Sequence, residues 1–219
     1  FLLNPISIII SAAHGQIDSI PTFLVILSIY LLTYHFTKFY TFLSALILGL
    51  AISIKPNPLI LLPVFLTFTK TDLKEKVVLL FLAIIPVFIL LMPFLQDNPN
   101  HVFDKLFNYS GSKDFGIPAL LKGIYYQQTS QYNLEFTKEV LDNTKALFLV
   151  GLSLVVLFLH RSKDLILGCL AAYLMFLLSY FGISAQYLSW ILPLAVIRRD
   201  KMIIPYSLFL FRYFKCITS

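Results

Sequence analysis

The sequence predicts an all-α fold: a polytopic bundle of transmembrane helices with one long extracytoplasmic loop. Apolar residues make up 58% of the 219 residues and charged residues only 13%, whereas a soluble domain is about half apolar and about a quarter charged. Several apolar runs approach the roughly 20 residues that cross a bilayer, and they are too numerous for one water-facing core. We therefore treat residues 1–219 as a single transmembrane domain, and we expect both ends to be cuts through a longer polypeptide.

The hydrophobic runs give the expected spans in chain order. Residues 1–13 fit the tail of a span or a half-buried segment. The later segments are 17–36, 40–54, 58–68, 77–95, 144–160, 165–182, 187–197 and, incompletely, 202–214. Segment 58–68 is shorter than a full span, and it fits half of a hairpin that dips into the membrane.

One boundary decides the topology of everything that follows it. If residues 40–68 formed a single kinked helix, each later segment would cross in the opposite direction. The sequence Lys55-Pro56-Asn57-Pro58 favours a turn instead, because proline lacks an N–H donor and disfavours helix in the residue before it. The sequence therefore predicts two segments here.

Basic residues indicate the orientation, because short cytoplasmic loops are enriched in Lys and Arg. With residues 14–18 placed outside, all the short basic clusters except Lys55 fall inside. These are Lys38; Lys70, Lys74 and Lys76; Arg161 and Lys163; and Arg198, Arg199 and Lys201. Segment 96–143 then becomes the extracytoplasmic loop, with a short interfacial helix expected at 117–126. The net charge of +6 is thus explained by membrane orientation, and nucleic acid is not an expected partner.

Three polar clusters fall together on the outside face in this topology: residues 14–18, 55–58 and 186–187. Polar and ionisable groups at membrane depth are costly and usually mark a site or a pathway. Their shared side predicts one site. The candidate residues for it are His14, Gln16, Asp18, Lys55, Gln186 and Tyr187.

Each candidate also has a purely structural explanation. Asp18 precedes a proline and fits the cap of a starting helix. Lys55 fits a cation that reaches the lipid interface as well as one that binds an anionic phosphate. Tyr187 and Trp190 fit an aromatic belt.

Motifs of soluble enzymes are missing from the sequence. It has no Gly-rich phosphate loop, no H-E-x-x-H pair, no nucleophile elbow and no D-x-D or E-x-D. The two cysteines, Cys169 and Cys216, match no metal-ligand or redox spacing. We therefore expect no metal site.

Three segments together resemble the GT-C membrane glycosyltransferases. Residues 4–21, with NPISI followed by HGQIDSIP, resemble the family's NP-x-x-I and GQ-x-D-x-(I/L) stretch. Residues 48–63 resemble its LG-x-A-(x)-K-P-x-P-L-x-L-L-P segment, and residues 185–193 its x-Q-Y-L-x-W-x-L-P segment. Within that group the segments resemble the mannosyltransferase-like family 87 enzymes and the mannosyltransferase of GPI-anchor assembly, and this GT-C resemblance implies a GT-C-like bundle.

The resemblance implies an enzyme of the cytoplasmic or ER membrane. Such enzymes move a sugar, with mannose the one expected here, from a polyprenyl-phosphate carrier to a glycan or glycolipid acceptor on the extracytoplasmic face. Their catalytic base is an acidic residue in an outside loop that would precede Phe1. By matching position, His14, Gln16, Lys55, Gln186 and Tyr187 would line the substrate site, with Asp18 as the fallback base.

Two other classes of function remain open from the residues alone. A transporter or flippase would distribute polar residues through the membrane depth, whereas here they gather at one face. A polysaccharide polymerase or ligase would use arginines in outside loops, and segment 96–143 contains none.

Overall fold

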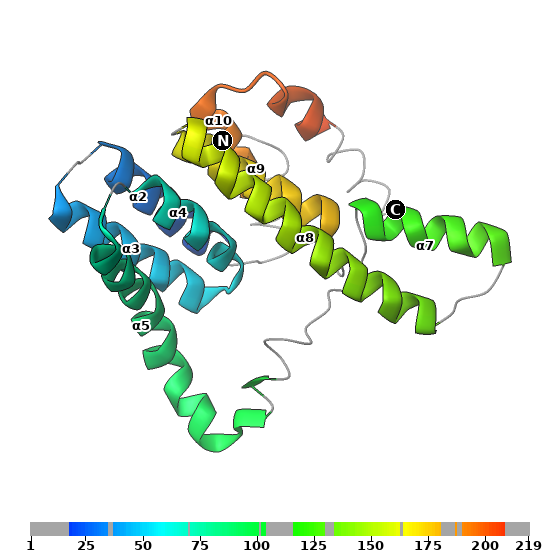
Figure 1. The fold of residues 1–219 in the computed structure, drawn as a ribbon, viewed down its shortest axis with the longest axis horizontal. Helices are drawn as coiled ribbons and strands as arrows, with labels where there is room; N and C mark the ends of the chain where they lie inside the picture. The colour runs from blue at the N-terminus through cyan, green and yellow to red at the C-terminus, as the bar shows by residue number, and fades with distance from the viewer. Residues whose placement is uncertain are drawn as a thin grey trace.

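The described part of the chain is helical throughout and contains no strand, as the sequence predicts (Figure 1). The computed structural model describes residues 18–34, 37–69, 71–100, 102–103, 116–129, 134–162, 164–180, 187 and 190–208. The principal helices are α2 (Ser19–Tyr34), α3 (Lys38–Ile54), the 3-10 helix η2 (Asn57–Leu61), α4 (Leu62–Phe68), α5 (Leu73–Asp97), α7 (Gly116–Thr129), α8 (Leu134–Ser162), α9 (Leu165–Ser179) and α10 (Ile191–Arg198).

The long polar segment 96–143 differs from the predicted loop. It contains α7, where a short helix is expected, and also the first part of α8, which begins at Leu134 instead of residue 144. The other expected spans between residues 17 and 197 each contain a helix or, for residues 58–68, η2 and α4. Segment 1–13 and the end of segment 202–214 lie outside the described residues.

Two aspartates begin the helices that follow the short turns at one end of the bundle. The Asp72 carboxylate accepts a hydrogen bond from the Glu75 backbone N–H at 2.8 Å, and Asp164 accepts one from the Leu167 N–H at 2.9 Å. Each satisfies an N–H group that the first turn of a helix leaves without a partner. Side-chain caps therefore fix where α5 and α9 start.

Helix α3 packs between α2 and α5 in the first half of the molecule (Figure 1). Ser28 of α2 and Ser44 of α3 are both buried, and each donates to the other's carbonyl, at 2.7 and 2.8 Å. On the other face of α3, Gly49 lies directly against the backbone of Ala83 in α5. Small residues therefore let three helices approach closely, as they commonly do in membrane bundles.

The second half of the described chain is built around α9. Helices α7, α8 and α10 all contact α9, and α4 connects the two halves by packing on α8 and α9. Phe148 of α8 meets Phe176 of α9 edge to face, with 5.8 Å between their ring centroids. The buried core is therefore continuous between the two groups of helices.

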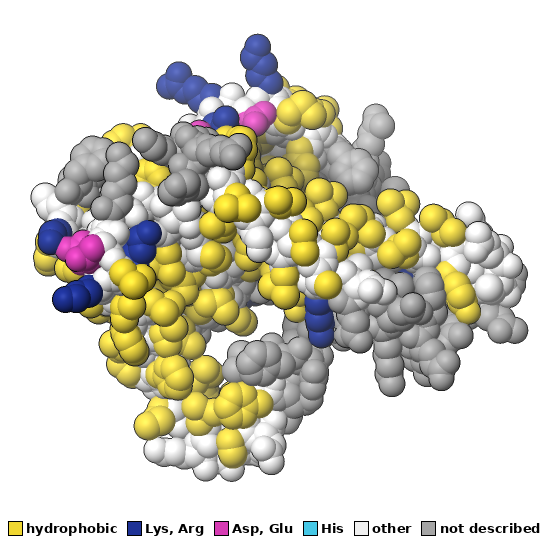
Figure 2. Space-filling view, in the orientation of Figure 1, with side chains coloured by type: hydrophobic (Ala, Val, Ile, Leu, Met, Phe, Trp, Pro, Cys, Tyr) yellow, Lys and Arg dark blue, Asp and Glu magenta, His cyan; other side chains and the backbone are white. Residues whose placement is uncertain are grey.

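The outer surface is largely apolar, above all along α5. Figure 2 shows apolar side chains across the middle of one face and most charged ones near its margins. Among the described helices, α5 alone is long and apolar enough to cross a membrane, and only 17% of its most apolar window is buried. The shorter apolar helices are Ser19–Tyr34, Lys38–Ile54, Asn57–Phe68, Asn143–Phe158 and Leu165–Ser179.

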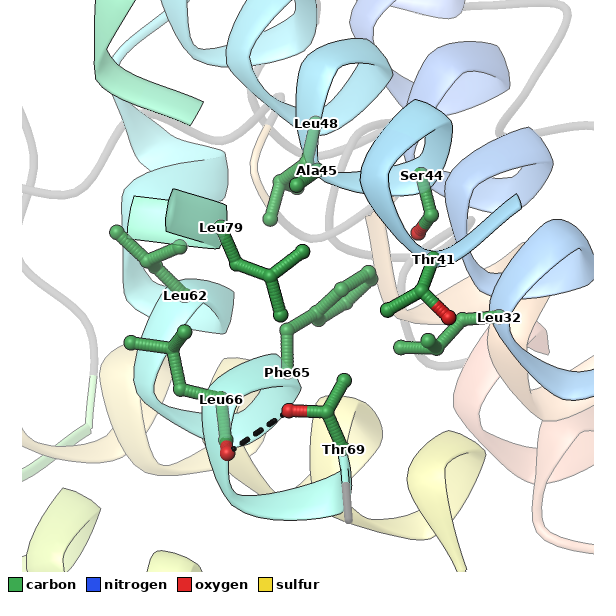
Figure 3. Close-up of a pocket in the computed structure, with 10 residues that line it drawn as sticks. All are labelled: Leu32, Thr41, Ser44, Ala45, Leu48, Leu62, Phe65, Leu66, Thr69 and Leu79. Carbon is green, nitrogen blue, oxygen red and sulfur yellow. Dashed lines mark hydrogen bonds between the residues drawn. The ribbon is translucent and has the colours of Figure 1, made fainter. Parts of the chain in front are cut away.

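The chain reverses direction after α3, as the turn prediction requires. Lys55 has an extended backbone, with φ −149° and ψ 127°, and α4 then brings the chain back to a pocket that the first half of α3 also lines. Figure 3 shows Phe65 and Thr69, from the end of this return, facing the same space as Thr41 and Ser44 from the first half of α3. The alternative of one kinked helix over residues 40–68 is therefore wrong.

A topology experiment tests the orientation predicted from the basic clusters. We expect reporter fusions at Asp72, before α5, and at Ser112, beyond its end, to report opposite sides of the membrane, with Asp72 inside. The physical reason is that α5 is the helix with the length to cross alone. Alkaline phosphatase and green fluorescent protein fusions would measure this, and the same side for both positions would refute the span count.

Candidate functional site

A buried ion pair joins the start of α2 to the residue that follows α3. Lys55 Nζ donates to Asp18 Oδ1, and the two residues are 37 positions apart in the sequence. The Asp18 side chain is 5% exposed and that of Lys55 is 18% exposed. A charge removed from water is tolerated when an opposite charge meets it, so each of these groups depends on the other.

The backbone of Asp18 helps to begin α2, while its side chain serves another purpose. The Asp18 carbonyl accepts hydrogen bonds from Thr22, from its N–H at 3.2 Å and from its hydroxyl at 2.7 Å. The carboxylate accepts instead from Lys55 across the bundle. The capping explanation of Asp18 is therefore insufficient for its side chain.

Two aromatic rings from the other half of the molecule flank the lysine. Lys55 Nζ lies 5.3 Å from the ring centroid of Tyr187 and 5.6 Å from that of Trp190. These two rings are 4.5 Å apart, and Trp190 is 5.6 Å from Tyr173 of α9. At these distances the faces of the rings attract an ammonium group. The site is thus assembled from α2, the turn after α3, α9 and the start of α10.

Three polar atoms around this ion pair are buried without a hydrogen-bond partner. They are Asp18 Oδ2, Asn57 Nδ2 and Trp190 Nε1. Buried polar atoms are nearly always satisfied, and leaving one unsatisfied costs about 1–3 kcal/mol. Two further atoms of this kind in the described residues, Thr33 Oγ1 and Thr71 Oγ1, lie away from Lys55, so three of five belong to this end of the bundle, where a ligand or water would supply their partners.

A small pocket opens beside the ion pair. Its closed part has a volume of only about 10 Å³, within about 190 Å³ of space that includes open solvent, and it is lined by Pro21, Thr22, Val25, Lys55, Pro58, Tyr173 and Trp190. A second pocket of about 200 Å³ shares Thr22, Val25, Tyr173 and Trp190 and continues toward Pro193 of α10. The cation and the indole therefore both face a recess between α2 and the α9–α10 side.

Another pocket lies toward the opposite end of α3 and is chemically different. Its empty space is about 250 Å³, and the side chains in Figure 3 are mostly aliphatic, with Phe65 among them. Its polar members are the hydroxyls of Thr41, Ser44 and Thr69, and it contains no charged residue. This pocket offers no group for acid–base or phosphate chemistry.

The far end of the bundle carries its own ion pairs. Lys38 at the start of α3 pairs with Glu75 at the start of α5, and Arg198 at the end of α10 lies 3.5 Å from Asp164, the cap of α9. Basic residues predicted to be cytoplasmic thus gather at the end of the helices opposite to Lys55. The sequence likewise predicts Lys38 and Arg198 on one side of the membrane and Lys55 on the other.

The structure brings together three of the six predicted site residues, namely Asp18, Lys55 and Tyr187. His14, Gln16 and Gln186 lie outside the described residues. The interpretation of Tyr187 and Trp190 as an aromatic belt does not fit, because they are only 7% and 5% exposed. Asn57 and Trp190 were missed as site residues, although both lie in segments that carry the family resemblance.

Comparison with known proteins gives one family match. A family model described as "ALG3 protein" matches residues 17–116, and this family comprises dolichyl-phosphate-mannose-dependent mannosyltransferases. No curated protein and no solved structure matches the chain. The matched stretch contains Asp18 and Lys55 and ends before Tyr187 and Trp190. The match covers 100 of the 219 residues, and over this stretch the chain is similar to that mannosyltransferase family.

Proposed function

We propose that this protein is a membrane mannosyltransferase that takes mannose from a polyprenyl-phosphate carrier and passes it to a glycan or glycolipid acceptor on the extracytoplasmic face. The observation that carries the proposal is the Asp18–Lys55 ion pair, because it lies within the stretch similar to the mannosyltransferase family. The ER membrane, where that family acts, and the cytoplasmic membrane both fit the predicted multi-span topology.

The chemistry of sugar transfer from a lipid phosphate makes two demands on such a site. The transferred sugar passes through a state with oxocarbenium character, and the departing phosphate needs donors aimed at its growing charge. Lys55 suits the second demand, because an ammonium group has three N–H donors and Asp18 takes one of them. We propose that the remaining donors of Lys55 meet the phosphate of the carrier.

The rest of the substrate site follows from the predicted residues. His14, Gln16, Gln186 and Tyr187 are proposed to line the groove for donor and acceptor, on the basis of their matching positions in the family's motifs. The lipid chain of the carrier would lie against apolar helix faces, of which α5 offers the most exposed one.

The test uses the full-length protein in detergent or liposomes, with polyprenyl-phosphate-mannose as donor. We expect wild-type protein to transfer mannose, and Lys55→Met to reduce kcat about 100-fold or more, because one donor to a developing oxyanion contributes on that order. Transfer of radiolabelled mannose to lipid-linked acceptors measures the rate.

Lys38→Met is the matched control for this variant. Lys38 is also paired with a carboxylate 37 residues away, but at the opposite end of α3 and with its side chain 77% exposed. Its loss should leave transfer near the wild-type rate. Equal losses for the two lysines, or wild-type transfer by Lys55→Met, would remove Lys55 from the phosphate site.

A further inference from the structure

The unsatisfied atoms at the ion pair are of two opposite kinds. Asp18 Oδ2 is an acceptor and Trp190 Nε1 is a donor, and both residues are more than nine-tenths buried. An unsatisfied acceptor and an unsatisfied donor near one cation point to a ligand that can both donate and accept hydrogen bonds. A hydroxyl group does both.

The charge of the cluster argues against a phosphate as the partner of these two atoms. The charge of Lys55 is already met by Asp18, and a phosphate oxygen brought to Asp18 Oδ2 would face a like charge. A phosphate also accepts without donating, so it would leave the aspartate oxygen unsatisfied. A neutral group with several hydroxyls satisfies both atoms without that repulsion.

The walls of the pocket fit the same kind of ligand. Trp190 and Tyr173 present neighbouring aromatic rings to the recess that Lys55 also lines. Asp18 is not among the lining residues, but its carboxylate lies next to the recess because it accepts a hydrogen bond from Lys55, which does line it. A sugar ring has the matching pattern, with C–H groups on its faces and hydroxyls around its edge.

We propose that Asp18 Oδ2 and Trp190 Nε1 bind hydroxyl groups of the transferred sugar and thereby contribute to the choice of sugar. This inference rests on the proposed function and goes further, because it assigns the phosphate and the sugar of the donor substrate to different residues. Lys55 serves the phosphate side, whereas Asp18 and Trp190 serve the sugar side. Asp18 then acts in recognition and not as the fallback base.

The experiment compares a carrier that has the sugar with one that lacks it. In the full-length protein, Trp190→Phe should raise KM for polyprenyl-phosphate-mannose about tenfold, the equivalent of one lost hydrogen bond. The inhibition constant of free polyprenyl phosphate, which has no sugar, should stay at its wild-type value. Tyr34→Phe, which changes an aromatic residue at the other end of α2, is the control and should change neither constant.

A second variant guards against an effect of ring size. Incorporating the benzothiophene analogue of tryptophan at position 190 keeps the bicyclic shape and replaces only the N–H by sulfur. It should reproduce the rise in KM seen for Trp190→Phe. Asp18→Asn keeps an oxygen for Lys55 but exchanges the second acceptor for a donor, so it should raise KM for polyprenyl-phosphate-mannose. Because it also removes the charge that meets Lys55, it should lower the inhibition constant of free polyprenyl phosphate, so the two constants should change in opposite directions.

The outcomes separate this inference from the function on which it rests. A parallel rise in KM and in the inhibition constant of polyprenyl phosphate would place Trp190 on the phosphate and overturn the inference. Unchanged constants in both position-190 variants would overturn it as well. If wild-type protein transfers no mannose from the carrier, the proposed function itself fails, whatever the variants do.

Discussion

Replacing Gly49 by alanine is expected to force α3 away from α5 and to lower the thermal stability of the protein. A β-carbon at this position would overlap the carbonyl oxygen of Ala83 and lie 2.9 Å from its carbonyl carbon. Because backbone atoms cannot rotate aside as a side chain can, the two helices must separate. Overpacking of this kind typically costs about 1–3 kcal/mol. The Tm of the detergent-solubilised protein measures the loss.

Gly123 in α7 provides the matched control, because a β-carbon there would meet nothing within 4 Å. Alanine is favoured over glycine inside a helix by roughly 0.5–1 kcal/mol, so Gly123→Ala should leave Tm unchanged or raise it slightly. The same substitution thus has opposite expected effects at two positions. A Gly49→Ala protein as stable as the wild type would show that α3 and α5 do not approach as closely as described.

Replacing Asp18 by leucine is expected to destabilise the protein strongly, because it leaves the Lys55 ammonium without its partner among aromatic rings. Removing one member of a buried ion pair costs about 3–5 kcal/mol. We expect the lower part of this range, since the Lys55 side chain retains 18% exposure and can turn toward water. Thermal unfolding and protease resistance of the purified protein would report the loss.

The double variant Asp18→Leu/Lys55→Met distinguishes the loss of the whole ion pair from the loss of one of its charges. With both charges removed, the stability should return toward that of the wild type, because apolar residues of similar volume often replace a buried pair with little loss. A double variant that is as unstable as the sum of the two single variants would show that the residues do not interact. The kcat for transfer should stay about 100-fold or more below the wild-type value in the double variant, even where stability returns.

The sequence was a good guide to the helices and to the turn after α3. The length of each apolar run predicts that a helix is present. The prolines at positions 56 and 58 exclude a continuous helix there, because proline lacks an N–H donor. It was a poorer guide to α8, whose first turns carry Glu135, Glu139 and Asp142 and therefore lack the apolar pattern of a span. A helix that extends beyond its apolar stretch has no hydrophobic signal there.

The site was only partly predictable for a different reason. Asp18 and Lys55 could be placed on one side of the membrane from the alternation of spans, but their pairing depends on how closely α2 and α3 pack. That closeness comes from the buried contact of Ser28 with Ser44. Trp190 was interpreted as interfacial because an apolar segment does not show which of its faces turns toward other helices and which toward lipid.

Helix α3 has a lysine at its first position and another immediately after its last, and each pairs with an acid from a different neighbour. Sliding α3 along its axis would separate the two ion pairs together, one from α5 and one from α2. The two ion pairs therefore hold α2, α3 and α5 in one register along the axis of α3, and this register fixes the position of the Lys55 ammonium in the recess.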